Sequence, residues 1–390
     1  MKKWLISSAI SALALTSAAS ADIKIAHVYG KTGPLEAYAK QSHDGLMLGL
    51  EYATGGTMEI NGEKIVVIEK DTQLKPDNGK ALLEEAYGDD EVDLAVGPVS
   101  SGVALAMLPV AAEYEKLLIV EPAVADSITG ANYNRYIFRT GRNSSQDAVA
   151  YAIALAGEDV HIATLAQDYA FGRDGIVAFR EALEGQGQGI AHEEYVPTDT
   201  TDFTAAAEHI FTAMKDLEGD KKLFIIWAGG GNPMGKIQAM DPYRFGVEIA
   251  TGGNILAAMK AYKDFPGLEG ATYYYYEIPK NDVNDWLVKT HQERFGTPPD
   301  FFTAGGMSAG IAVVEAIKKA GSTDTEELIT AMEGMEWETP KGTMKFRAED
   351  HQAMQTMYHF KIKVDDNVEW AIPELVRELK LEDLPIPVRN

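Results

Sequence analysis

Short apolar runs alternate with amphipathic helical stretches along most of this 390-residue chain, and this order limits the fold more than any other feature. In the first third, four expected strands are separated by three expected helices. The strands are 23–30, 64–71, 92–98 and 116–122, and the helices are 42–52, 77–87 and 103–114. Strand-helix-strand order is typical of a parallel sheet with helices on both faces. This part predicts one α/β lobe.

A second series of the same kind follows. Its expected helices are 146–156, 174–183 and 204–215, and its expected strands are 161–168, 190–197, 222–229, 247–253 and 271–279. Three later helices, 285–295, 305–320 and 325–332, have no strands between them, so we expect them to complete the first lobe. The strand-like run 356–364 would then complete the second lobe.

The predicted fold class is therefore α/β, with two doubly wound parallel-sheet lobes joined by a three-crossing hinge. Lobe 1 comprises residues 22–141 and 278–355, and lobe 2 comprises residues 142–277 and 356–390. Ligands of such sheets bind beyond the carboxyl ends of the strands. We expect a binding cleft between the lobes.

The N-terminus has the pattern of a secretory signal peptide. Lys2 and Lys3 precede an apolar run from Trp4 to Leu15, and the small-residue site Ala19-Ser20-Ala21 follows. The run is too short and too interrupted for a membrane span. The sequence predicts that residues 1–21 are removed after Ala21.

The cysteine content and net charge of the chain indicate what kind of exported protein it is. The chain has no cysteine, so it offers no lipid attachment point and no disulfide. Its net charge is −24, and loss of Lys2 and Lys3 with the leader makes it −26. Such acidity disfavours nucleic-acid binding and self-association. We expect a soluble periplasmic protein, a monomer, that needs no cofactor.

Two adjacent serines, Ser100 and Ser101, follow the strand at 92–98 and precede a helix. Their hydroxyls and the free N–H groups of the helix start could hold an anion, activate a nucleophile, or cap the helix. A second serine, Ser308, lies in the hydrolase-like pattern Gly306-Met307-Ser308-Ala309-Gly310. That pattern needs a strand-to-helix turn, whereas the residues around Ser308 suit a closely packed helix.

Two other motifs are incomplete. Residues 230–236 fit a phosphate loop, but Ile237 stands where a metal-binding Ser or Thr belongs, which favours an ordinary turn beside the cleft. The eight histidines form no zinc-binding spacing, and we predict no metal site.

Several side chains follow strands or crossings and are candidates for the cleft. Tyr169 and Phe171 follow the strand 161–168, where they either face the cleft or pack the loop. Tyr276, near the end of a run of four tyrosines, is expected to face the cleft. Arg142 lies at the first crossing, where it pairs either with a ligand carboxylate or with an interlobe carboxylate.

With these features placed, the mature chain resembles the type I periplasmic solute-binding proteins of ABC transporters, in the branched-chain amino-acid-binding group. The resemblance is carried by the order and spacing of several loose motifs. They are IKIAHVYGKTGPLEAYAKQ, AVGPVSSGVALAMLPVA, LLIVEPAVADSIT, FRTGRNSSQDAVA, QDYAFGRD, TDTTDFTA and PKGTMKFRAEDHQAM. The resemblance implies a small-molecule ligand and a partner permease in the membrane.

The resemblance also implies site residues. A serine and backbone groups of that family hold the ligand's carboxylate, and these positions correspond to Ser101, with Ser100 adjacent, and Ala123. The family's threonine falls on Ala125, so one hydroxyl is missing. The family's aromatic wall falls on Tyr38, Phe171 and Phe302.

A further departure concerns the ligand's ammonium group. Amino-acid binders of this group place an acid after a strand of lobe 2, where this chain has Thr251-Gly252-Gly253-Asn254. A buried ammonium without a carboxylate is costly, so we expect an aromatic acid, of the benzoate or hydroxycinnamate type. Asn254 and Arg142 would contact its polar substituents. The alternatives are an amino-acid-binding protein, an exported serine hydrolase using Ser308 or Ser101, and a sensory ligand-binding protein.

Overall fold

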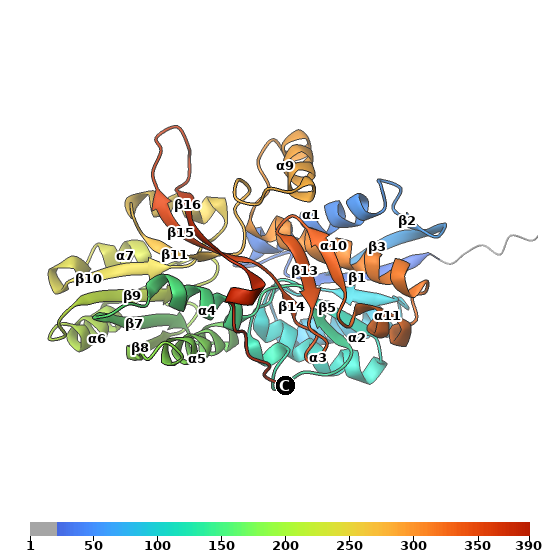
Figure 1. Ribbon diagram of the computed structural model, residues 1–390. Coiled ribbons are helices and arrows are strands. Elements are labelled where there is room, and N and C mark those ends of the chain that lie inside the picture. Colours follow the sequence, from blue (N-terminus) through green and yellow to red (C-terminus); the bar gives the residue numbers. More distant parts are fainter. Residues whose placement is uncertain (1–21) are drawn as a thin grey trace, which may run out of the picture.

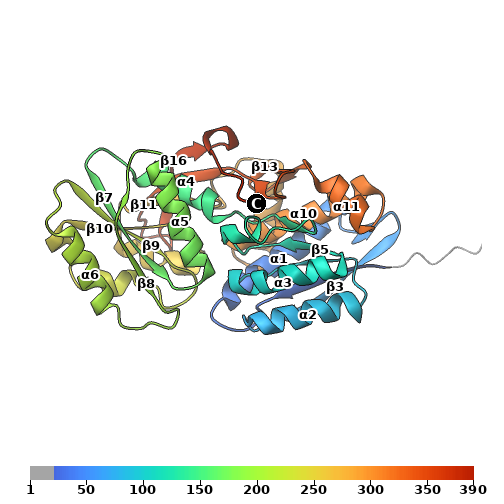
Figure 2. The ribbon, with the colours of Figure 1, turned by 90° about the horizontal axis from the view of Figure 1, so that it is seen from below.

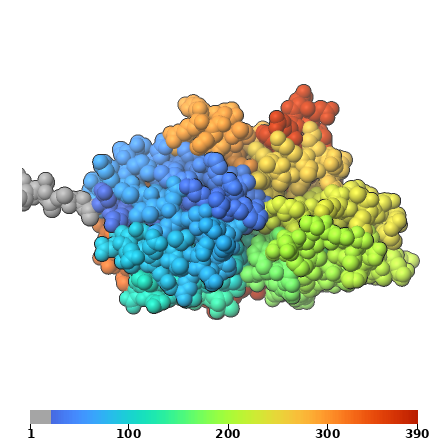
Figure 3. Space-filling view, turned by 180° about the vertical axis from the view of Figure 1, so that it is seen from behind, coloured from blue at the N-terminus to red at the C-terminus, as the bar shows by residue number. Residues whose placement is uncertain are grey.

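The computed structural model describes residues 22–390, so the predicted signal peptide and its cleavage site lie outside the described residues. These residues form two α/β lobes side by side (Figure 1). Seen from behind, the segments of lobe 1 near the N-terminus meet lobe 2 along one boundary (Figure 3). The predicted α/β class is confirmed.

Lobe 1 is built on a six-stranded sheet in the order β2-β3-β1-β4-β5-β6. All neighbours are parallel except β2 and β3. The strands are β1 (Ile23–Tyr29), β2 (Glu59–Ile60), β3 (Glu63–Asp71), β4 (Leu94–Val96), β5 (Leu117–Val120) and β6 (Ile137–Arg139). The helices are α1 (Glu36–Ala53), α2 (Pro76–Gly88), α3 (Ser101–Tyr114), α9 (Asp282–Phe295), α10 (Phe301–Ala320) and α11 (Thr325–Met332). A small antiparallel sheet adds β12 (Glu336–Thr339), β13 (Gly342–Phe346) and β14 (Ala353–Met354).

The alternation of side chains along β1 explains why helices cover both faces of this sheet. Ile25 packs into the core shared with α1 and α10, whereas Ala26 and Val28 pack into the core shared with α2 and α3. Figure 2 shows α2 and α3 together on one side of the sheet. A strand that is buried on both faces reads as a continuous apolar run, as the sequence does here.

Helices α1 and α10 pack unusually closely because glycines face each other across their contact. A Cβ on Gly306 would lie 2.1 Å from the Ser42 carbonyl oxygen, and one on Gly45 would lie 2.1 Å from the Thr303 carbonyl oxygen. Helix α10 is long and apolar enough to cross a membrane, but 89% of its apolar stretch is buried inside the protein. It is a core helix of lobe 1.

Lobe 2 contains a four-stranded parallel sheet in the order β10-β9-β7-β8 and an antiparallel sheet in the order β11-β15-β16. The strands are β7 (Val160–Gln167), β8 (Ile190–Val196), β9 (Asp220–Ile226), β10 (Val247–Thr251), β11 (Glu269–Thr272), β15 (Met357–Lys363) and β16 (Ile372–Leu379). The helices are α4 (Ser144–Leu155), α5 (Ala170–Glu184), α6 (Thr204–Met214), α7 (Met234–Gln238) and α8 (Leu256–Met259). Helices α4 and α5 cover one face of the parallel sheet, and α6 and α7 cover the other.

The chain passes between the lobes within residues 140–143, 273–281 and 355–356. The tyrosine run was expected to be a strand, but β11 ends at Thr272 and the four tyrosines lie in the second crossing. The sequence-based division placed all of 356–390 in lobe 2. The last residues contact both lobes: the Ile386 carbonyl accepts from Arg347 of lobe 1 at 2.8 Å, and Arg389 donates to Ser145 of lobe 2 at 2.9 Å.

Candidate functional site

A cavity lies between the lobes at the carboxyl ends of their parallel strands, as expected for this topology. The empty space between its walls is about 880 Å³ with the open solvent at its mouth counted, and the centre of a water-sized sphere can occupy about 90 Å³ of it. Lobe 1 contributes the start of α1, the turn between β4 and α3, the loop after β5 and the start of α10. Lobe 2 contributes the start of α4, the turn between β7 and α5, the end of β9 and the loop after β10.

Seven of the eleven predicted binding residues line this cavity: Tyr38, Ser101, Arg142, Tyr169, Phe171, Asn254 and Phe302. The other four, Ser100, Ala123, Ala125 and Tyr276, are not part of its wall. The structure thus brings most of the predicted residues together, while their role in binding stays a prediction.

The start of helix α3 presents free donors at the cavity. Ser101 is the first residue of α3, and its Oγ accepts a hydrogen bond from the Ala125 N–H at 3.2 Å, which leaves its own proton free. Among residues 22–390, the N–H groups of Ser101, Gly102 and Val103 have no acceptor. By contrast, at the start of α4 the N–H groups of Ser144 and Ser145 donate to the Val124 carbonyl and to Asp126.

The backbone donor expected at Ala123 is already used within lobe 1, and so is the N–H of Ala125, where the family's threonine hydroxyl is missing. The Ala123 N–H donates to the Pro98 carbonyl at 3.2 Å, and the Ala125 N–H donates to Ser101. The Ala125 carbonyl accepts from the buried Arg139 at 2.7 Å. Ser100 is the N-cap of α3, but its side chain makes no capping bond. Of this predicted anion site, only Ser101 reaches the cavity.

Tyr38 connects the two lobes across the cavity. Its hydroxyl donates to Oδ1 of Asn254 at 2.9 Å and accepts from the Gly229 N–H at 3.0 Å. Its ring lies 4.5 Å from the ring of Phe302. The expected wall residue is therefore also an interlobe contact. Its partners in lobe 2 are Gly229, just before the incomplete phosphate-loop pattern, and Asn254, in the loop after β10.

Asp300 forms a second interlobe contact beside the cavity. Its Oδ1 caps α10 by accepting from the Phe301 N–H at 2.7 Å, and its Oδ2 accepts from the Leu256 N–H of lobe 2 at 2.9 Å. Gln41 also donates to it, at 2.8 Å. Burial raises the pKa of the Asp300 carboxyl to about 6.

Aromatic side chains supply much of the remaining wall. The rings of Tyr169 and Phe171 lie 5.8 Å apart at the start of α5. Both residues line the cavity, which is the first of the two positions expected for them. Burial raises the pKa of Tyr169, so its hydroxyl stays protonated at neutral pH. Tyr276 was expected in the same cleft, but it lines a smaller neighbouring cavity of about 270 Å³ instead. The two cavities share Asn254.

Arg142 makes an ion pair at the cavity wall with Asp147, which is not among the binding residues predicted from the sequence. Its Nε donates to Oδ1 of Asp147, in the first turn of α4, at 2.8 Å. Burial raises the pKa of the Asp147 carboxyl, and Arg142 opposes that rise. The expectation of a cleft without a carboxylate is therefore wrong. The sequence did contain a signal for this pair: Asp147 is a charged residue among the apolar residues of the expected helix 146–156, five positions after Arg142.

Ser308 has no catalytic surroundings. It is fully buried within α10, and its hydroxyl donates to the Ala304 carbonyl at 2.8 Å. No histidine among residues 22–390 hydrogen-bonds to it. This is the packed-helix environment that the sequence favoured.

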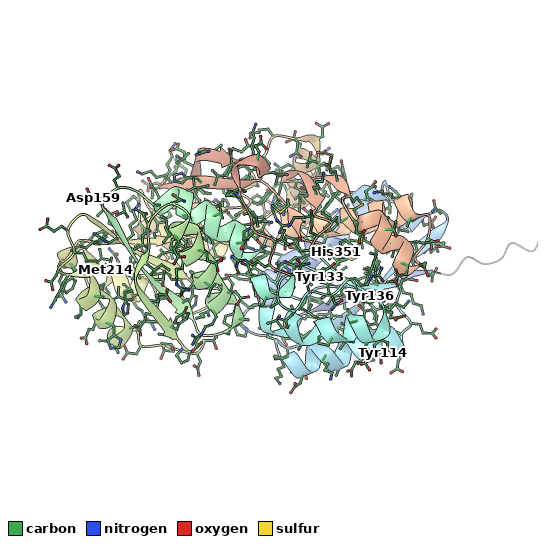
Figure 4. The ribbon with its side chains drawn as sticks, turned by 60° about the horizontal axis from the view of Figure 1, so that its bottom comes forward. Tyr114, Tyr133, Tyr136, Asp159, Met214 and His351 are labelled. Carbon is green, nitrogen blue, oxygen red and sulfur yellow. The ribbon has the colours of Figure 1, made fainter. Side chains whose placement is uncertain are left out.

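His351, which follows Ser308 in the chain as a catalytic histidine would, belongs to lobe 1's interior. It stacks on Phe138 with ring centroids 3.9 Å apart, and its Nε2 lies 3.3 Å from the Tyr133 hydroxyl. Figure 4 labels His351 and Tyr133 in this lobe. Within residues 22–390, no group of three or more His, Asp or Glu side chains is arranged to hold a metal ion.

Comparisons with known proteins agree with this geometry. Residues 22–367 match the family model described as periplasmic binding protein. The chain is 26% identical over 352 residues to a Leu/Ile/Val-binding protein of Rhizobium johnstonii, covering 88% of this chain and 92% of that protein.

Two solved structures from Rhodopseudomonas palustris are similar over most of the chain. One, described as an ABC-type branched-chain amino acid transporter, is 66% identical, with a TM-score of 0.85, and covers 95% of this chain and 100% of that chain. The other is an ABC transporter solute-binding protein in complex with 3,4-dihydroxybenzoic acid. It is 27% identical, with a TM-score of 0.80, and covers 95% of this chain and 99% of that chain.

These relatives are substrate-binding proteins of ABC transporters and not enzymes, so the hydrolase alternative is wrong. Proteins of this kind bind small molecules and work with membrane permease components. The two-lobed fold, the interlobe cavity and the match over residues 22–367 lead to one conclusion: the chain belongs to the periplasmic binding protein family, as a solute-binding protein of an ABC transporter.

Proposed function

We propose that this protein binds a small aromatic carboxylate in its interlobe cavity and delivers it to a membrane permease. It would act as a monomer in the periplasm, after cleavage of the leader behind Ala21. The observation that carries the proposal is the start of α3: Ser101 lines the cavity with an unused hydroxyl proton and an unpaired N–H, and several aromatic side chains lie in the same wall.

The anion would bind at α3 because a helix N-terminus carries partial positive charge and its first N–H groups need acceptors. A ligand carboxylate supplies those acceptors. The Ser101 proton would add one charge-assisted hydrogen bond. Among residues 22–390, no lysine lines the cavity and Arg142 is the one arginine that does; because Arg142 is paired with Asp147, the start of α3 is the anion site we propose.

The apolar body of the ligand would lie among the aromatic side chains of both lobes. The cavity wall includes Tyr38 and Phe302 from lobe 1, and Tyr169, Phe171 and Trp227 from lobe 2. Flat rings stack favourably on such side chains. Closure is favoured because the ligand contacts both lobes only when they meet.

An amino-acid ligand is the second candidate, and one observation favours it. Asp147 lies in the cavity wall, where its carboxylate could meet an ammonium group. The relative that is 66% identical is also described as a branched-chain amino acid transporter. One observation speaks against an amino-acid ligand. Its ammonium group would have to share Asp147 with Arg142, and the charge of Arg142 already neutralises the Asp147 carboxylate.

A thermal-shift panel of benzoates, hydroxycinnamates and branched-chain amino acids tests the proposal. A ligand at 100 times its dissociation constant stabilises the folded state by about 2.7 kcal/mol. We expect melting temperatures to rise with members of the aromatic group. A rise with leucine or valine and none with any aromatic acid would show that the aromatic assignment is wrong.

A further inference from the structure

The Arg142–Asp147 ion pair lies in the wall of the main cavity. The two side chains are 11% and 12% exposed, and a single hydrogen bond of 2.8 Å joins Nε of Arg142 to Oδ1 of Asp147. The guanidinium also lies over two rings, 4.8 Å from the centroid of Tyr273 and 5.1 Å from that of Phe301. Such cation–π contacts fix the plane of the guanidinium.

The pair keeps both an unused donor and an unused acceptor. Among residues 22–390, the two Nη groups of Arg142 have no hydrogen-bond partner, and neither has Oδ2 of Asp147. None of these atoms is among the fully enclosed polar atoms that lack a partner, so they stay accessible. Since both residues line the cavity, donor and acceptor are presented to it side by side.

We propose that this pair recognises a hydroxyl group on the aromatic ring of the ligand. A hydroxyl oxygen accepts a hydrogen bond from Nη of Arg142, and its proton is donated to Oδ2 of Asp147. The inference rests on the proposed function, since it assigns a second contact to the same ligand. It makes the ligand class a hydroxy-substituted aromatic acid.

Other substituents match the pair less well. A methoxy group accepts but cannot donate, so Asp147 loses its partner. An ammonium group donates but cannot accept, so Arg142 loses its partner and faces a like charge. An unsubstituted ring leaves both groups desolvated and unpaired, which is costly. The ligand's own carboxylate is disfavoured here because it would lie beside the carboxylate of Asp147.

The test is a calorimetric titration of the whole mature protein with benzoate, with the three hydroxybenzoate isomers and with their methoxy analogues. We expect the best hydroxybenzoate to bind at least about 10-fold more tightly than both benzoate and its own methoxy analogue. Equal affinity for the hydroxy compound and benzoate would overturn the inference while leaving the proposed function standing. Binding of leucine or valine, with no binding of any benzoate, would instead contradict the proposed function.

An Asp147→Asn variant tests the residue itself, because the amide keeps the shape of the side chain but not its charge. We expect the preference for the hydroxy compound over benzoate to fall to within about 3-fold. An unchanged preference would overturn the assignment to Asp147. If Asp147→Asn does not fold, as judged by its melting curve, the wild-type comparison above decides alone.

The chain offers a matched control with the same residue types and spacing. Arg173 donates through Nε to Oδ1 of Asp168 at 2.7 Å, but this pair is exposed and does not line the cavity. We expect Asp168→Asn to keep both the affinities and the hydroxyl preference of the wild type. If Asp168→Asn also loses the preference for the hydroxy compound over benzoate, that preference does not arise at the Arg142–Asp147 pair.

Discussion

The hydroxyl of Tyr38 in lobe 1 donates a hydrogen bond to Oδ1 of Asn254 in lobe 2, over 2.9 Å. The same hydroxyl accepts from the Gly229 N–H, so one side chain ties together two loops of the opposite lobe. Both bonds run from lobe 1 to lobe 2, so they require the two lobes to be in contact. Tyr38 therefore contributes to affinity through closure as well as through any contact with the ligand.

Replacing Tyr38 by phenylalanine should weaken ligand binding while leaving the packing on Phe302 intact. Loss of two interlobe hydrogen bonds destabilises the closed state by about 1–2 kcal/mol, which raises the dissociation constant about 5- to 30-fold. Titration calorimetry measures the change. Tyr52→Phe is the control, because Tyr52 also lies in α1 but packs against Trp286 within lobe 1. Equal affinities of Tyr38→Phe and wild type would contradict this role.

The two adjacent serines should behave differently. Ser101→Ala removes the hydroxyl proton that faces the cavity and should weaken binding by about 1–3 kcal/mol. Ser100→Ala should change it by less than about 0.5 kcal/mol, since Ser100 does not line the cavity. Melting curves check that both variants are folded. If Ser100→Ala weakens binding as much as Ser101→Ala, the anion site is placed wrongly.

Asp300 should make the stability depend on pH. Its pKa is about 6 in the folded protein, above its ordinary 3.8. The folded state therefore binds more protons than the unfolded state between about pH 4 and 6, and the free energy of unfolding falls as pH rises through that window.

The difference in unfolding free energy between wild type and Asp300→Asn should fall by at most about 3 kcal/mol from pH 4 to pH 7. Denaturant unfolding at several pH values measures it. A difference that stays constant, or that grows as pH rises, would contradict the assignment.

Close packing of α1 on α10 predicts a strong effect of one methyl group. Gly306→Ala places a Cβ 2.1 Å from the Ser42 carbonyl oxygen and should destabilise the protein by about 1–3 kcal/mol. Gly235→Ala in α7 meets no atom within 4 Å and should raise stability by up to about 1 kcal/mol. Thermal unfolding compares the two. A Gly306→Ala variant as stable as wild type would show that the helices can separate freely.

Much of this fold could be predicted because buried parallel strands are continuous apolar runs. The order of apolar runs and helices predicted two α/β lobes. The position of Ser101 at the carboxyl end of a strand predicted that it lies at the cavity. Strand β16 was not expected, because its sequence IPELVREL is rich in helix-forming Glu, Leu and Arg. Pairing along β15 overrides that propensity.

The site was harder to predict where it depends on packing between distant segments. Nothing local shows that the N–H groups near Ala123 and Ala125 are taken by Pro98 and Ser101. Asp147 was missed because its approach to Arg142 depends on how the crossing enters α4. Tyr276 lines the neighbouring cavity and not the main one, because β11 ends before it.

A crystal structure of the protein with the benzoate that stabilises it most tests the central claim directly. We expect the ligand's carboxylate within about 3 Å of Ser101 Oγ, at the start of α3, with its ring among the aromatic side chains of the cleft. A carboxylate bound away from α3, or a cleft that admits leucine and no benzoate, would contradict the account.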